Sequence, residues 1–188
     1  MTKLYIMDIS PLCGEELFTR SLELVSGERR EKALGFLRRR DAALSVGAEL
    51  LLRYALIRDF RVKKLPEISL AVRGKPYFKN PQGLYFSLSH SGDYVACLAS
   101  DENEVGVDIQ QVQSARMPAA KRVLSEKAYA RLEAVEERDR DGLFFELWVL
   151  HESAVKLKGG SVFDSINCDG SRLVDAPEGY RIAVAIGV

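Results

Sequence analysis

The chain has 188 residues, enough for one large domain or two small halves, and its 27 basic side chains balance 27 acidic ones. Because the net charge is zero, no overall field favours nucleic acid or an anionic membrane, so any anion site must be local. The three cysteines are odd in number and form no C-x-x-C pair, which argues against a disulfide framework or a cysteine-rich zinc site.

The N-terminus turns acidic at Asp8 before any apolar signal core develops. The most apolar later run is interrupted by Glu49 and Arg53, so it is no candidate for a membrane span. With the unpaired cysteines, these features predict a soluble protein of the reducing cytoplasm that is not secreted.

Residues 3–9 alternate in polarity as a strand does, and Ser10-Pro11 then provides a cap with proline at the first helical position. A helical pattern continues from there to Phe60, with a second cap at Ser26. Within it, apolar residues recur at helical spacing at Ala48, Leu51, Leu52, Ala55 and Leu56, which predicts a long supporting helix.

The one local excess of positive charge lies in residues 29–32, Arg-Arg-Glu-Lys, and in the three arginines at 38–40. Both runs fall within the helical region. On their own such charges form a solvated helix face in most proteins, and an anion site is the alternative.

Pro66 ends the helical region, and residues 68–70 form a short strand that leads into a turn at 73–77. The glycine and proline of that turn place Lys75 on a constrained loop. Residues 84–91 and 94–99, separated by Gly92-Asp93, predict a β-hairpin.

A further strand is expected at 105–110, followed by helices at 118–124, 126–137 and 141–158, a stop at Gly159-Gly160, and strands at 166–174 and 180–188. The order of strand, helices and strands therefore occurs twice. We predict an α+β fold with two similar halves, residues 1–102 and 103–188, related by a pseudo-twofold axis.

Strand periodicity places Gly106, Asp108 and Gln110 on one face of the 105–110 strand. On the last helix, Glu152 and Lys156 lie one turn apart on the same edge. Magnesium needs only one or two carboxylates plus substrate phosphate oxygens, and Asp108 with Glu152 would suffice. The alternative is a solvated strand face and an ordinary ion pair along the helix, about 0.3 to 0.5 kcal/mol in strength.

The pair Ser89-His90 suggests a nucleophile and its base, but neighbours on a strand point to opposite faces. No G-x-S-x-G motif is present either, so a hydrolase is disfavoured, and phosphate binding suits His90 better. With only two histidines in the chain, His90 and His151, a catalytic zinc site lacks the three protein ligands that it needs.

Four segments together resemble the 4′-phosphopantetheinyl transferases of the surfactin-synthetase-activating type, and their order and spacing match over nearly the whole chain. The segments are Gly74-Lys75-Pro76-Tyr77-Phe78, Phe86-Ser87-Leu88-Ser89-His90-Ser91-Gly92, Gly106-Val107-Asp108-Ile109 and Trp148-x-x-x-Glu152-Ser153-x-x-Lys156. The resemblance implies a two-halved fold in which coenzyme A and magnesium bind between the halves. It also implies the transfer of phosphopantetheine from coenzyme A to a serine of an apo acyl or peptidyl carrier protein, with release of 3′,5′-adenosine bisphosphate.

The resemblance further implies roles for individual residues. Asp108 and Glu152 would hold magnesium, Glu152 would accept the serine proton, and Lys156 would steady the pyrophosphate. Contacts to the nucleotide end of coenzyme A would come from Lys75, Ser89 and His90, and from Arg29 and Lys32 on the basic helix. Lys156 would also contact coenzyme A. The partners expected are coenzyme A and the carrier protein, with no nucleic acid or membrane, and the chain is expected to be a monomer.

Three positions depart from the family's pattern. Gln110 stands where a second acid is frequent and would offer the metal only an amide oxygen. His151 replaces the usual lysine before Glu152, and Leu44 lies near the place of an arginine in some relatives. Gln110 and His151 leave open a degraded relative that binds coenzyme A or a carrier protein without transfer.

Overall fold

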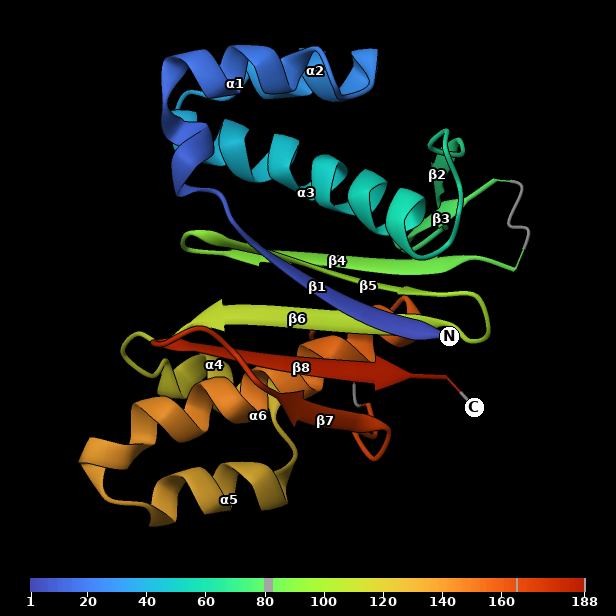
Figure 1. The fold of residues 1–188 in the computed structure, drawn as a ribbon. Coiled ribbons are helices and arrows are strands. Elements are labelled where there is room, and N and C mark those ends of the chain that lie inside the picture. The colour runs from blue at the N-terminus through green and yellow to red at the C-terminus, as the bar shows by residue number, and fades with distance from the viewer. Residues whose placement is uncertain (80–82, 165, 188) are drawn as a thin grey trace.

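The computed structural model describes residues 1–79, 83–164 and 166–187 (Figure 1). Its elements in chain order are β1 (Thr2–Asp8), the 3-10 helix η1 (Ser10–Cys13), α1 (Glu15–Leu22), α2 (Gly27–Leu34), α3 (Arg39–Arg58), β2 (Ile68–Leu70), β3 (Pro76–Phe78), β4 (Tyr85–Ser91), β5 (Tyr94–Ser100), β6 (Val105–Gln111), α4 (Met117–Val123), α5 (Glu126–Ala134), α6 (Glu137–Lys158), β7 (Ser171–Val174) and β8 (Tyr180–Ile186). The predicted α+β class is confirmed.

Two antiparallel sheets of three strands share one topology. Their strand orders are β1-β5-β4 and β6-β8-β7, so in each sheet the last strand of the set is central and the first two are the edges. The long helix α3 covers the first sheet and α6 covers the second, on opposite outer faces (Figure 1). This repetition supports the prediction of two similar halves; the division at residues 102 and 103 stays a prediction.

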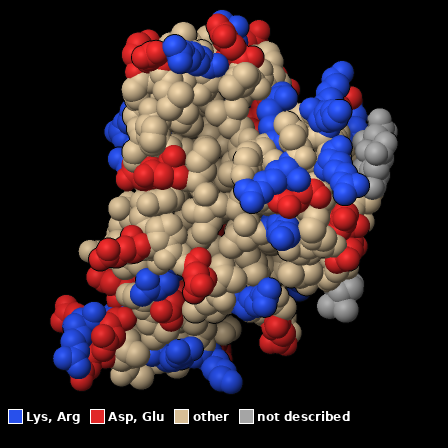
Figure 2. Space-filling view, viewed as in Figure 1, with Lys and Arg blue, Asp and Glu red and all other residues tan. Residues whose placement is uncertain are grey.

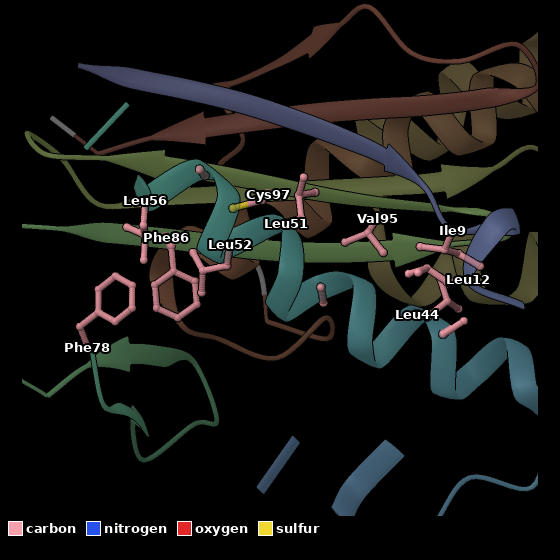
Figure 3. Close-up of a cluster of buried hydrophobic side chains, with 13 residues drawn as sticks. Ile9, Leu12, Leu44, Leu51, Leu52, Leu56, Phe78, Phe86, Val95 and Cys97 are labelled. Atoms are coloured by element: carbon pink, nitrogen blue, oxygen red, sulfur yellow. The ribbon is translucent and has the colours of Figure 1, made fainter. Parts of the chain in front are cut away.

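The first hydrophobic core lies between α3 and the first sheet (Figure 3). The apolar residues predicted for the inner face of the long helix are all buried, from Ala48 to Leu56. Leu44 belongs to the same core, is 8% exposed, and packs in one cluster with Ile9 and Leu12. The residue at this position therefore faces the core and not a phosphate.

The second core fills the space between the two sheets. Val105, Val107 and Ile109 of β6 pack there with apolar residues of β5 and β8. The predicted two-sided strand is confirmed, because the other face of β6 turns Gly106 and Asp108 toward α6. That polar face is the one that helps to form the site.

The predicted turn, helix end and second cap are confirmed, but the predicted cap at Ser10 is wrong, because Ser10 lies inside η1 and Ile9 is the N-cap. The hairpin between β4 and β5 turns at Gly92, whose φ is +55°, and α6 ends at Gly159, whose φ is +66°. Ser26 caps α2 by accepting a hydrogen bond from the backbone N–H of Arg29. Within the part of the chain that the structure describes, no helix combines the length and apolar composition needed to cross a bilayer.

The strand predicted from residue 166 begins only at Ser171. Asn167 and Asp169 bond to each other through side chain and backbone, and Ser171 N donates to Cys168 O, so these residues form turns. The last strand ends at Ile186, and residue 188 of its predicted range lies outside the described residues.

Candidate functional site

The two sheets meet where β4 lies beside β6. Serine hydroxyls on alternate positions of β4 accept hydrogen bonds from backbone N–H groups of β6. The three bonds are Val107 N to Ser87 Oγ at 3.0 Å, Ile109 N to Ser89 Oγ at 3.3 Å and Gln111 N to Ser91 Oγ at 3.0 Å. We call this row of bonds the serine ladder. The serine ladder joins β4 and β6 as parallel neighbours and places Ser89 next to Asp108.

Helix α6 packs very closely against β6 at Gly106, on the face of the strand opposite the second core. A Cβ atom there would lie 2.1 Å from the backbone oxygen of Ser153 and 2.5 Å from the backbone nitrogen of Leu157. Only glycine permits this spacing. It brings Glu152 and Lys156, on the same helix, to the level of Asp108.

Asp108, Ser89 and Lys156 form a triangle of hydrogen bonds. Lys156 Nζ donates to Asp108 Oδ1 at 2.6 Å and to Ser89 Oγ at 2.8 Å, and Ser89 Oγ donates to Asp108 Oδ1 at 2.7 Å. Asp108 is 1% exposed, so the alternative of a solvated strand face is wrong. The alternative also supposed an ion pair between Glu152 and Lys156 along the helix. In the structure Lys156 instead pairs with Asp108, across the joint of the two sheets.

Glu152 is half-buried beside this triangle. Burial raises the pKa of its carboxyl group, and the negative charge of Asp108 raises it further, whereas Lys156 lowers it. Two carboxylates are therefore close enough to repel each other. A cation bound between them would relieve that repulsion.

Gln110, the third oxygen donor predicted for a metal, turns its amide nitrogen and not its oxygen toward Asp108. Its Nε2 donates to Asp108 Oδ2 at 3.2 Å, and its Oε1 accepts from Ser91 Oγ at 3.3 Å. Among the described residues no group of three or more His, Cys, Asp or Glu side chains is arranged to hold a metal. Two carboxylates and an amide nevertheless fit Mg²⁺, which prefers oxygen and takes its remaining ligands from water and substrate phosphates.

His90 follows Ser89 on β4 but extends from the opposite face of the strand, as predicted. Loss of hydration, and then the charge of Lys156, lower the pKa of its imidazole, which keeps the ring neutral at pH 7. No hydrogen bond joins Ser89 to His90 in the described structure, which removes the geometric basis for a hydrolytic dyad.

Lys75 lies at the C-terminal end of α6. Its Nζ donates to the backbone oxygen of Leu157 at 2.5 Å and to Glu104 Oε2 at 2.9 Å, so the β2–β3 turn holds the end of the helix. Its neighbour Pro76 lines a cavity of about 250 Å³ whose walls include Tyr77 and Phe86.

Arg29 and Lys32 line a separate recess of about 540 Å³ between α2, α3 and β2. Pro76 also lines this recess, so the recess adjoins the cavity beside Lys75. Arg29 donates to Ser45 Oγ at 3.2 Å and to Glu49 Oε2 at 3.4 Å.

Glu49 is the anchor of this recess, since it is 3% exposed and accepts from Ser26 as well. Burial alone would raise the pKa of Glu49, but its bonds from Ser26 and Arg53 outweigh burial and lower the pKa. Sequence reasoning missed Arg53 and Lys64, which line the recess, and Ser45, which accepts a hydrogen bond from Arg29. Ser45, Glu49 and Arg53 lie four residues apart on one face of α3, and this spacing was a usable signal for Ser45 and Arg53.

His151 lies away from the triangle. It is 4% exposed, and its Nε2 lies 2.8 Å from the backbone oxygen of Val162, in the segment after α6. The side chain therefore fastens that segment to the helix. The departure from the family's lysine at this position does not alter the group that faces Asp108.

Charge on the surface is mixed. Figure 2 shows acidic and basic side chains interspersed over one face, with basic side chains more frequent on the side where β2 and β3 lie in Figure 1. This distribution agrees with a local anion site instead of a molecule-wide field.

Comparisons with known proteins agree with these observations. Residues 13–103 match the family described as "4'-phosphopantetheinyl transferase, N-terminal", and residues 104–180 match the "4'-phosphopantetheinyl transferase superfamily". The chain is 31% identical over 184 residues to a 4'-phosphopantetheinyl transferase of Bacillus subtilis, covering 93% of this chain and 80% of the relative. It is 29% identical over 178 residues to Sfp of Bacillus subtilis strain 168, covering 90% and 79%. With AcpT of Escherichia coli K12 it shares 38% identity over 109 residues, covering 57% and 56%.

Proposed function

The chain belongs to the 4′-phosphopantetheinyl transferase family and is an enzyme of that class, and we propose that it transfers phosphopantetheine from coenzyme A to a serine hydroxyl of an apo acyl or peptidyl carrier protein. 3′,5′-Adenosine bisphosphate would be the second product. The observation that carries the proposal is the buried Asp108 held against Lys156 at the joint of the two sheets, with Glu152 one helical turn from that lysine.

Magnesium would be held by Asp108 and Glu152. Gln110 would offer its amide oxygen as a third donor after a turn of the amide group, whose nitrogen faces Asp108 in this structure. When bound, it would neutralise the charge that shifts across the pyrophosphate as the phosphoryl bond breaks. The triangle supports this assignment because it holds one of the two carboxylates in a fixed, buried position.

Glu152 would accept the proton of the attacking serine, directly or through a water. Its place on α6, one helical turn from Lys156, supports this role, because a general base must lie within reach of the proton that it accepts. Lys156 would steady the pyrophosphate, as its side chain is 29% exposed while its ammonium group contacts Asp108.

The nucleotide end of coenzyme A would lie along the recess and the adjoining cavity. Arg29 and Lys32 would contact its phosphates from the recess. Lys75 and the neutral imidazole of His90 would contact it from the β2–β3 turn and from β4.

We also propose that the enzyme acts as a monomer in the cytoplasm, with halves at residues 1–102 and 103–188, and needs neither nucleic acid nor a membrane. The three cysteines are free, which suits a reducing compartment. His151 is one of the two departures that motivate the alternative of a degraded relative that only binds, and it lies away from the triangle, which weakens that alternative.

The proposal is tested by chromatography of 3′,5′-adenosine bisphosphate. We expect its release to require coenzyme A, an apo carrier protein and Mg²⁺ together, and to be lost in Asp108→Ala and Glu152→Ala variants that keep their folded circular dichroism spectrum. Release at full rate from either variant contradicts the metal assignment. Binding of coenzyme A without release, across several carriers, indicates the degraded relative.

A further inference from the structure

Ser89 has a hydroxyl group whose hydrogen-bonding capacity is fully used inside the protein. A serine hydroxyl offers one donor and two acceptor lone pairs. Here it donates to Asp108 Oδ1 at 2.7 Å and accepts from Lys156 Nζ at 2.8 Å and from Ile109 N at 3.3 Å. The residue is 5% exposed. No donor or lone pair is left for a phosphate of coenzyme A.

The serine ladder gives the natural comparison for Ser89. Ser87 has the same relation to β6, accepting from Val107 N at 3.0 Å, but touches neither Asp108 nor Lys156. Ser91 accepts from Gln111 N and donates to Gln110. All three serines therefore join β4 to β6. Of the three, only Ser89 also hydrogen-bonds to both Asp108 and Lys156.

The backbone bond to Ile109 gives Ser89 a fixed position relative to Asp108, because the two β6 residues are adjacent in the chain. In this position the Ser89 hydroxyl donates a hydrogen bond to Asp108 Oδ1 and accepts one from the ammonium group of Lys156. The carboxylate orientation and the lysine position are therefore set by one side chain.

On the basis of these contacts we propose that Ser89 is a positioning residue, which orients Asp108 and Lys156 for the metal and the pyrophosphate, and is not a ligand of the nucleotide. This inference rests on the proposed function, because it assumes that Asp108 holds Mg²⁺. Side chains that orient a metal ligand commonly change metal affinity by about 10- to 100-fold when removed.

The test titrates Mg²⁺ by calorimetry into protein saturated with coenzyme A, without carrier protein so that no turnover occurs. Wild type is compared with Ser89→Ala, Ser89→Thr and the matched control Ser87→Ala. Affinity for coenzyme A is measured separately in EDTA by equilibrium dialysis, and melting temperatures are recorded for all four proteins.

We expect Ser89→Ala to weaken Mg²⁺ binding by about 10- to 100-fold, Ser89→Thr to restore most of it, and Ser87→Ala to change it by less than about threefold. Affinity for coenzyme A in EDTA should fall less than affinity for Mg²⁺ in Ser89→Ala, because only the displaced Lys156 contributes to that loss, and it should change by less than about threefold in Ser87→Ala. A similar melting temperature for Ser87→Ala and Ser89→Ala would show that the difference is not general instability.

Two results overturn the inference while leaving the proposed function intact: equal Mg²⁺ affinity in wild type and Ser89→Ala, or a loss of coenzyme A affinity in EDTA larger than the loss of Mg²⁺ affinity. Equal losses in Ser87→Ala and Ser89→Ala also overturn it, since the ladder alone would then be responsible. Wild type that binds no Mg²⁺ overturns the metal assignment and this inference together.

Discussion

Gly106 sets the distance between α6 and β6, and Gly106→Ala tests whether that distance matters for catalysis. The added Cβ would lie 2.1 Å from Ser153 O, and contacts under 3.0 Å are essentially never seen, so the helix must move outward by roughly 1 Å. Both close atoms belong to the backbone, so no side-chain rotation can relieve the clash.

Two magnitudes follow from that displacement. Overpacking of a buried site costs about 1 to 3 kcal/mol, which for a chain of this size lowers the melting temperature by roughly 2 to 12 °C. A misplacement of about 1 Å in a catalytic group can lower the rate by about 100-fold, and α6 carries Glu152 and Lys156 away from Asp108. We therefore expect loss of rate out of proportion to loss of stability.

The assay combines thermal denaturation with the initial rate of carrier modification at a temperature where every variant is folded. Gly142→Ala is the matched control on the same helix, since its Cβ would lie 3.4 Å from Nη2 of the Arg181 side chain, an ordinary contact distance, and near no backbone atom of another element. It should raise stability by about 0.4 to 1 kcal/mol and leave the rate unchanged. A full rate in Gly106→Ala despite a lower melting temperature would refute the link between helix spacing and site geometry.

Three further predictions concern charge. Glu152→Gln should raise the melting temperature at pH 7 in EDTA, because a raised pKa means that the ionised carboxylate opposes folding; the gain should vanish below pH 4.5, where Glu152 is protonated in folded and unfolded chains. A gain that persists at low pH would point to packing instead. His151→Lys should lower stability by several kcal/mol, because an ammonium group would replace a side chain that is 4% exposed, and should not raise the transfer rate; a faster enzyme would revive the idea of a degraded site. Arg29→Ala and Lys32→Ala should each raise KM for coenzyme A by about 3- to 10-fold and leave kcat within about twofold. The rise in KM should be smaller at high salt, because salt screens the attraction between these side chains and the phosphates. Arg30→Ala, on the same helix but outside the recess, should have no effect.

Local patterns in the sequence were sufficient for much of the fold. Alternation along β6 predicted which residues face the second core, and Gly92 and Gly159 marked a hairpin and a helix end. These features depend on neighbours in the chain and on backbone conformations that glycine favours. The two-halved α+β organisation followed from the order of the elements.

The interactions at the site depend on residues far apart in the chain, and periodicity alone does not reveal them. Spacing along the helix favoured a pair between Glu152 and Lys156, but tertiary packing placed a more buried carboxylate, Asp108, within reach of the lysine. The serine ladder was missed because its hydroxyls bond to backbone N–H groups twenty residues away. The burial of His151 likewise depends on the segment that follows α6.

The central claim is that this enzyme modifies a serine of a carrier protein with phosphopantetheine from coenzyme A. Intact mass spectrometry of an apo carrier, incubated with the enzyme, coenzyme A and Mg²⁺, tests it most directly, with EDTA and a carrier whose modified serine is changed to alanine as controls. We predict a gain of one phosphopantetheine group that is absent from both controls. An unchanged carrier mass across several carrier types, with coenzyme A bound, would contradict the claim.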